Sequence, residues 1–204
     1  SAKDYEKTPW ARHVTIDNPN IRGLVQNLPR FIPCQPIPVV QIPGLSSKVV
    51  GFWGLWKITI SAIDWKHTRI MPLFVSDDGR VFTPSARRIW DQFLSATPTI
   101  LRHLDLEESA QAFEQFTCAA ERSGKVIHDE LLQIHREYIK KEREKILYAF
   151  TSQKKAIERI GLPQVRNYRL RQLAREKRRL LDDLDQRSKV VPEMVPIIIV
   201  RIEG

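Results

Sequence analysis

Apolar residues in the second half of the chain recur every three or four positions, the spacing of helices that pack side by side. The pattern forms two runs separated by Gly161-Leu162-Pro163. It predicts one helix over residues 105–160 and a second over residues 163–186, folded back as an antiparallel hairpin because so short a connection leaves little room for anything else. The apolar stripe consists of Ile127, Leu131, Ile134, Tyr138, Ile146, Phe150, Ile157, Ile160, Leu170, Leu173, Leu180 and Leu184.

The lengths and ends of the two helices make further predictions. Gly161 is expected to close the first helix in the left-handed conformation, and Pro163 suits the first turn of the second helix. The first helix is the longer, so only its distal half pairs within the hairpin. We expect its proximal half, residues 105–135, to pack on a globular body. A bend or break is expected at Ser123-Gly124, because glycine inside a helix costs up to about 1 kcal/mol.

A second pattern, alternation among β-branched and aromatic residues, predicts a sheet. Residues 49–63 give the clearest strand, and residues 69–76 give another. Asp77-Asp78-Gly79 predicts a tight hairpin turn in which glycine supplies the positive φ, and the chain then pairs back briefly.

The segments on either side of the hairpin complete the predicted body. Residues 83–94 are expected to form a short helix, and residues 95–100 a plain link to the hairpin. The continuous apolar run Ile197–Ile202 predicts a buried strand that rejoins the sheet next to the first strand.

The first 45 residues have weaker patterns. Residues 2–15 are expected to have little structure, and residues 21–28 to form one short amphipathic helix. Residues 30–45 contain four prolines, which excludes a helix and a central strand and predicts an extended segment along a surface.

These elements define an α+β fold: a small, mostly antiparallel sheet with short helices and a long projecting antiparallel helical hairpin inserted before the last strand. Three regions follow. Residues 1–104 form the sheet-containing body with its lead-in, residues 105–190 the hairpin, and residues 191–204 the final strand returning to the sheet.

Charge is distributed unevenly along the hairpin. The chain has a formal net charge of +9; residues 136–179 hold fifteen basic and five acidic side chains, whereas residues 105–135 hold two and seven. One interpretation is a solvated helix face with pairs such as Glu137–Lys141. The other is a basic arm that contacts phosphate or an acidic protein surface. The nucleic-acid-binding candidates are then Arg136, Lys140, Lys141, Arg143, Lys154, Lys155, Arg159, Arg166 and Arg169.

The sequence holds no motif for catalysis, for a cofactor or for a metal ion, so we expect none of these sites in the domain. No glycine-rich segment matches the GxxxxGK pattern. His128 and His135 are seven positions apart, about two helical turns, which is too far for one metal ion. Asp77-Asp78 is explained by turn chemistry. The tryptophans suit core packing better than a base-stacking platform.

Two features bear on the compartment. Cys34 and Cys118 are far apart in sequence and make no disulfide framework, which favours a reducing environment. No apolar run approaches the length of about 18 residues that a membrane helix needs. We therefore expect a cytoplasmic protein without a membrane contact.

Parts of the chain are similar to a region of known ATPases. Thr15–Arg22 resembles the helix that follows an HP-x-[IV]-R element downstream of the motor in bacterial RapA/HepA-like Swi/Snf-type ATPases. Trp53–Ile58 and Pro72–Arg80 are similar to the strand pair that follows there. The long charged hairpin and the final strand, Pro192–Ile202, resemble the end of that region, as in the large helicase-like subunits of DISARM-type phage-defence systems.

The resemblance implies a non-catalytic C-terminal accessory domain of a bacterial nucleic-acid-dependent ATPase, with ATP and Mg²⁺ in an upstream motor. It implies nucleic acid, with DNA as the first choice, or the parent motor as the partner. The chain departs from the family in the proline-rich segment 31–43 and in the extra basic residues of the hairpin tip. The alternative is a structural protein–protein interaction or dimerisation module that uses the apolar stripe, especially the uncovered part from Phe113 to Ile134.

Overall fold

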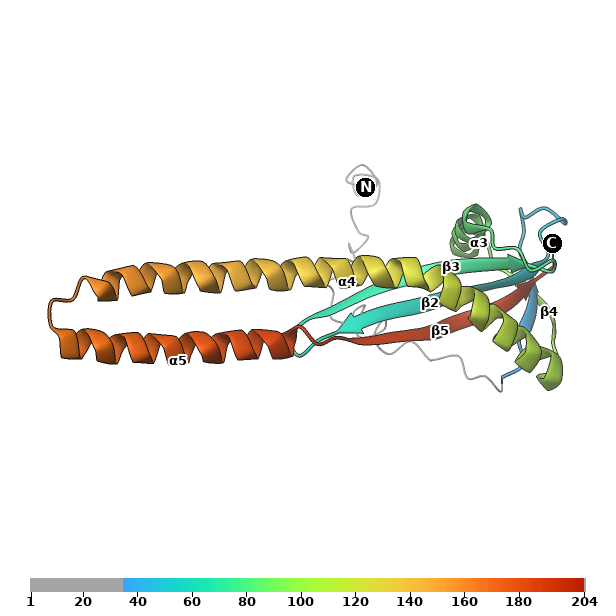
Figure 1. Cartoon of the computed structure of the whole chain (residues 1–204). Helices are drawn as coiled ribbons and strands as arrows, with labels where there is room; N and C mark the ends of the chain where they lie inside the picture. Colours follow the sequence, from blue (N-terminus) through green and yellow to red (C-terminus); the bar gives the residue numbers. More distant parts are fainter. Residues whose placement is uncertain (1–34, 204) are drawn as a thin grey trace, which may run out of the picture.

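Five strands form one mixed sheet in the order β3-β2-β5-β1-β4. The computed structural model describes residues 35–203, so the predictions for residues 2–15 and 21–28 lie outside the described residues. Two helices extend from the sheet as a long arm (Figure 1). The described elements are β1 (Pro38–Gln41), β2 (Gly51–Ser61), β3 (Lys66–Ser76), α3 (Thr83–Ser95), β4 (Thr99–His103), α4 (Leu106–Glu158), α5 (Pro163–Arg187) and β5 (Val191–Ile202).

The three long strands confirm the predicted centre of the sheet. β2 pairs antiparallel with β3 along its whole length and with β5 on its other side. The register with β5 shifts between Leu55 and Trp56, which face Ile198 and Pro196. Gly79 has a φ of +79° in the predicted turn after β3, and Val75 pairs with Val81 beyond it. The end of the chain therefore returns to the first strand, and the α+β class is confirmed.

Two predictions about the smaller strands are wrong. Residues 38–41 form an interior strand, β1, although prolines surround them: Pro38 occupies its first position, so Val39 and Val40 keep the N–H groups that pair with β4 and β5. Residues 95–100 are no plain link, because β4 begins at Thr99. Every residue of β4 is exposed, so the strand has no buried alternation for a sequence pattern to reveal.

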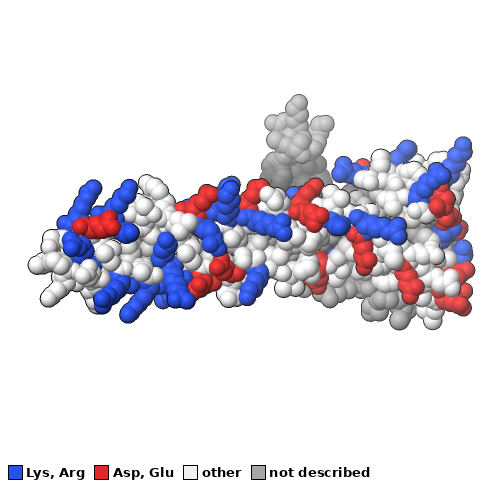
Figure 2. Space-filling model, viewed as in Figure 1, with Lys and Arg blue, Asp and Glu red and all other residues white. Residues whose placement is uncertain are grey.

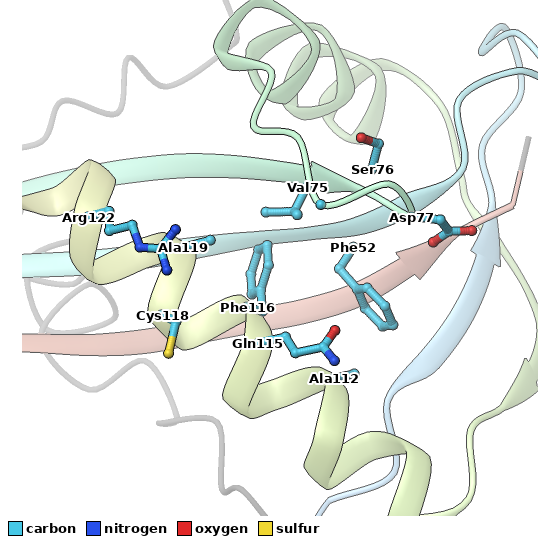
Figure 3. Close-up of a pocket in the computed structure, with 11 residues that line it drawn as sticks. Phe52, Val75, Ser76, Asp77, Ala112, Gln115, Phe116, Cys118, Ala119 and Arg122 are labelled. Carbon is cyan, nitrogen blue, oxygen red and sulfur yellow. The ribbon is translucent and has the colours of Figure 1, made fainter.

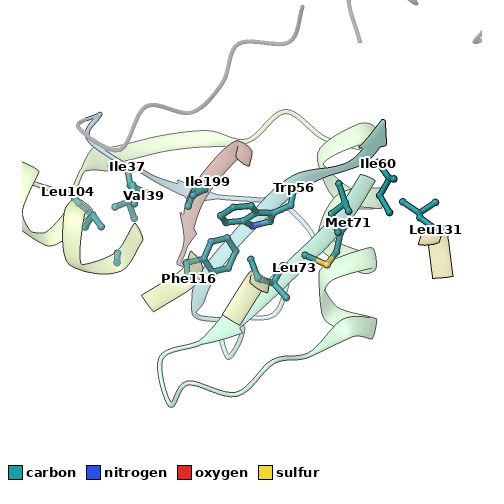
Figure 4. Packing of buried hydrophobic residues seen from close by; sticks show 13 residues of the cluster. Ile37, Val39, Trp56, Ile60, Met71, Leu73, Leu104, Phe116, Leu131 and Ile199 are labelled. Carbon is teal, nitrogen blue, oxygen red and sulfur yellow. The ribbon is translucent and has the colours of Figure 1, made fainter. Parts of the chain in front are cut away.

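The proximal half of α4 lies on one face of the sheet, as predicted (Figures 1 and 4). Phe116 and Leu131 of α4 are buried against Trp56 and neighbouring strand residues. The alternative function assumed that Phe113–Ile134 is uncovered, and this premise is wrong, because the sheet itself covers that part of the stripe. Val126, at 62% exposure, and Ile134, at 41%, are the exposed large apolar residues of this range.

The helix α4 is not broken at Ser123-Gly124, although it curves where it crosses the sheet (Figure 1). A Cβ on Gly124 would lie 3.0 Å from the Met194 sulfur and 3.2 Å from Cδ1 of Ile58. Glycine therefore allows close approach of helix and sheet here, and helical hydrogen bonding continues past it.

The opposite face of the sheet carries α3 near one end. Ala86 and Ile89 of α3 pack on Trp53, Phe74 and strand residues around them. The indole Nε1 of Trp53 donates a hydrogen bond of 2.9 Å to the carbonyl oxygen of Ala86. Trp53 and Trp56 are thus core residues on opposite faces, which excludes them from a base-stacking surface.

Within the arm, α5 returns along the distal half of α4, as predicted, but two details differ. The buried residues of α4 near the root of the arm are Leu131, His135 and Ile139. Leu131 belongs to the predicted stripe, whereas His135 and Ile139 each lie one residue beyond the predicted positions 134 and 138. Gly161 does not have a positive φ. The helix ends instead through tighter bonds, from Arg159 N–H to Ala156 and from Ile160 N–H to Ile157.

The arm is fixed to the body where α5 ends. His135 is buried, and its Nε2 lies 3.2 Å from the carbonyl oxygen of Arg187. Its ring packs on Trp65, with centroids 4.6 Å apart. Arg187 donates through Nη1 to Asp64, in the turn between β2 and β3, at 2.9 Å. These contacts connect α4, α5 and the sheet at one point.

Candidate nucleic-acid interface

The arm carries the whole net charge of the chain. Residues 140–182 contain fourteen basic and five acidic side chains, a balance equal to the formal +9 of all 204 residues, so the remainder is formally neutral. Figure 2 shows the basic side chains gathered over the distal part of the arm, whereas acidic ones mix with them toward the body. The candidate interface is therefore the distal arm, built from α4 and α5.

The nine predicted candidates do not form one surface. Arg136, Lys140, Arg143 and Lys154 lie on one face of α4, because with Leu147 and Thr151 they follow each other at steps of three or four. We call this face the α4 side row. It contains no acidic residue between its two ends. Arg143 is paired with Asp185 of α5, and Lys154 lies 3.7 Å from Glu158.

Three other candidates lie on the outer face of α4. Lys141, Lys155 and Arg159 share this face with Lys145 and Tyr148, again by the three-or-four spacing. All three candidates are exposed, and no ion pair of the described residues involves them. Lys145 donates to Glu142, and this hydrogen bond and the carboxylate charge raise the pKa of the lysine.

The last two candidates have different surroundings. Arg166 is half-buried, and its Nη1 donates to the carbonyl oxygen of Ile160 at 3.4 Å, so it supports the connection between the helices. Arg169 is exposed beside Ile157 and Tyr168, in a shallow hollow of the hairpin. Arg169 remains a candidate for ligand contact, whereas Arg166 has a structural role.

Sequence reasoning left out a row of arginines on α5. Arg171, Arg175 and Arg178 follow at steps of four and three, are all exposed, and have no ion pair with any described residue. We call them the α5 arginine row. The signal was present in the sequence, since the same spacing rule that defined the apolar stripe places these three on one outward face. Most of the predicted candidates came from α4 instead.

Few carboxylates neutralise the tip. Between residues 154 and 179, a stretch with ten basic side chains, Lys154–Glu158 is the one ion pair among the described residues. Glu158 and Glu176 are the acidic residues of this stretch, so ten basic residues against two leave it with a formal charge of +8. The remaining ammonium and guanidinium groups form no ion pair with a described carboxylate.

A hollow of the body lies elsewhere, between α4 and the ends of β2 and β3 (Figure 3). It has a volume of about 530 Å³, and Phe52, Val75 and Phe116 give it an apolar floor. Asp77, at its rim, binds Arg201 through two hydrogen bonds of 3.0 Å. Burial lowers the pKa of Arg201, but the hydrogen bonds and charges of Asp77 and Glu203 together outweigh it, so the pKa is raised. Asp77 is therefore held in a structural ion pair.

Two general findings concern residues 35–203. No group of three or more His, Cys, Asp or Glu side chains in this range is placed to hold a metal ion. None of the helices in this range has a stretch apolar and long enough to cross a lipid bilayer.

Comparison with known proteins gives no assignment. No protein-family model matches the chain, and neither the curated proteins nor the solved structures include a match.

Proposed function

We propose that this chain is a non-catalytic accessory domain that binds nucleic-acid phosphates through the distal arm. The observation that carries the proposal is the charge segregation: residues 140–182 hold all of the net charge on a projection whose basic side chains are exposed and largely unpaired. A polyanion releases its condensed counterions when such groups approach, which drives association.

The arrangement favours positioning over sequence recognition. Basic side chains occupy the outer face of α4 and that of α5 as well as the α4 side row. Contacts of lysine and arginine with phosphate fix the register of a protein on a duplex but carry no base sequence. Duplex DNA is accordingly the proposed ligand, bound without sequence preference. The resemblance to RapA/HepA-like proteins supports a Swi/Snf-type ATPase as the parent, in which the arm would hold the DNA beside the motor.

The test is the salt dependence of binding to a labelled duplex of about 20 base pairs, followed by fluorescence anisotropy. We expect the logarithm of the association constant to fall linearly with the logarithm of salt concentration. Replacing the α5 arginine row by Arg171→Gln, Arg175→Gln and Arg178→Gln should make this slope shallower, by about 0.9 for each phosphate that the variant no longer neutralises.

The control is Arg87→Gln with Arg88→Gln on α3, which removes two exposed arginines from the body. The control should leave the affinity and the slope unchanged. An equal loss of affinity for each charge removed in the two variants would mean that binding follows total charge and not the arm. Binding that does not respond to salt would contradict the proposal outright.

A further inference from the structure

An apolar groove runs between the two helices of the distal arm. Phe150 and Thr151 of α4 and Leu170, Leu173 and Ala174 of α5 line it, and its volume is about 290 Å³. Lys154 of α4 lies on one side of the groove and Lys177 of α5 on the other. The groove therefore combines an apolar floor with a basic rim. Arg171 and Arg178 of the α5 arginine row border it, because they lie three and four positions from Ala174.

The groove exists because two helices alone cannot enclose their shared apolar seam. Leu184 is the one fully buried residue of α5. Leu147 and Leu180 are each 37% exposed, and Ala174 is exposed at the groove itself. In helical bundles, such positions are covered by a third helix. The seam of this arm has room for one.

The basic residues beside the groove determine the charge of a helix that could bind there. The α4 side row runs alongside the groove, since Thr151 and Lys154 belong to both. It presents Arg136 and Lys140 without an ion pair among the described residues, and Lys177 is likewise unpaired. A basic helix would be repelled by this rim, whereas acidic side chains on the two flanks of an apolar stripe would meet it.

We infer that this groove binds an acidic amphipathic helix of a protein partner, which completes a three-helix bundle with α4 and α5. An amphipathic helix lays its apolar face into a groove through residues spaced at three and four positions. Leucines of the partner would pack on Phe150 and Leu173, and its glutamates would pair with Lys177 and compete with Glu158 for Lys154. The site goes beyond phosphate binding and does not depend on it.

The probe is a fluorescein-labelled peptide of about 18 residues, with leucine at the a and d positions and glutamate at e and g, which spans about 27 Å as a helix. The protein is titrated into it at low salt and followed by anisotropy. We expect saturable binding that Ala174→Phe weakens at least about tenfold, because the new ring fills the groove. Lys177→Glu should weaken binding as well and keeps the inference testable if Ala174→Phe fails to fold.

The controls separate the groove from general charge. A peptide with lysine in place of every glutamate should not bind. A variant with glutamine at Lys141, Lys155 and Arg159, on the outer face of α4 away from the groove, should bind the acidic peptide within about twofold of the native protein, although it binds duplex DNA less tightly. Ala174→Phe should do the reverse, so failure of the inference is distinguishable from failure of the proposed function.

Three results would overturn the inference. The first is the absence of saturable binding by the acidic peptide at low salt. The second is equal weakening of DNA and peptide binding by Ala174→Phe, which would make the groove part of the nucleic-acid surface. The third is a dimer in sedimentation equilibrium that Ala174→Phe abolishes, which would show that a second copy of this chain fills the groove.

Discussion

Gly54 is the residue on which three elements converge. A Cβ at this position in β2 would lie 2.7 Å from the carbonyl oxygen of Ile198 in β5 and 2.7 Å from Cε1 of Phe116 in α4. The carbonyl belongs to the backbone of a paired strand and has little room to move. The absence of a side chain at Gly54 therefore allows β5 and α4 to approach β2 this closely.

We expect Gly54→Ala to lower the free energy of unfolding by about 1–3 kcal/mol, the cost of forcing extra volume into a packed site. Urea unfolding followed by tryptophan fluorescence measures this, because Trp53 and Trp56 flank the site. Gly161→Ala is the matched control, since a Cβ there meets nothing within 4 Å. Equal midpoints for the native protein and Gly54→Ala would show that the strands separate at low cost.

At the scale of elements, the two helices of the arm differ in what holds them. The proximal half of α4 packs on the sheet through Phe116, Ala120 and Leu131. By contrast, α5 contacts α4 and is anchored by Leu184 and by Arg187 at its end. The arm is consequently expected to open without unfolding of the body, because regions with few buried apolar contacts open first.

Leu184→Ala should therefore act locally. Truncation of a buried leucine costs about 2–5 kcal/mol, which is enough to release α5 from α4. Hydrogen exchange measured by mass spectrometry should show faster exchange over α5 and the distal half of α4, with β2 and β5 unchanged. Leu180→Ala, at a position 37% exposed on the preceding turn, should change exchange much less. Uniform acceleration across the sheet would show that arm and body unfold as one unit.

A helix or strand could be predicted from the sequence when the pattern of apolar residues within that element determines its structure. The helices and β2 were predicted because each buries a long periodic face, and β5 was predicted from the continuous apolar run at its end. In β1, the place of Pro38 at the first position of the strand mattered more than the number of prolines around it, and composition does not contain that information. The buried stripe is shifted by one residue at His135, because this polar residue is buried there through contacts with Trp65 and Arg187.

The sequence predicted which part of the chain forms the candidate interface. It did not predict which basic side chains share a surface. The distribution of charge along the chain identified the distal arm, since charge is a property of the sequence. Assigning Arg143 and Arg166 to ligand contact was premature, because Asp185 and the carbonyl of Ile160 already engage them. The groove beside Phe150 depends on the relative placement of two helices, which no single helix pattern specifies.

At the scale of the whole molecule, body and arm are chemically distinct. The body is formally neutral and holds both core clusters. The arm has a formal charge of +9, and Leu184 is the one buried residue of α5 at the contact between its two helices. The stability of the domain therefore depends mainly on the neutral, well-packed body. The proposed binding surface lies on the charged arm. Changes in the arm can then alter affinity while the body stays folded.

Removal of the arm tests this separation. We expect a variant in which a short Gly-Ser linker replaces residues 140–182 to keep the root contacts of His135, Leu184 and Arg187 and to melt cooperatively. Its formal charge is zero, because the deleted segment carries the full +9. Affinity for duplex DNA should fall to the background level, since the counterion-release contribution disappears with the basic side chains. Differential scanning calorimetry measures the first outcome, and anisotropy measures the second.

A second variant distinguishes the charge of the arm from its presence. It keeps the full hairpin but carries glutamine at the α5 arginine row and at Lys141, Lys155 and Arg159. Because these positions are exposed, the substitutions should leave the melting temperature nearly unchanged. DNA affinity should fall most of the way to that of the armless variant, whereas the acidic peptide should still bind in the groove. Retention of DNA binding by the armless body would place the nucleic-acid surface on the sheet and contradict the assignment to the arm.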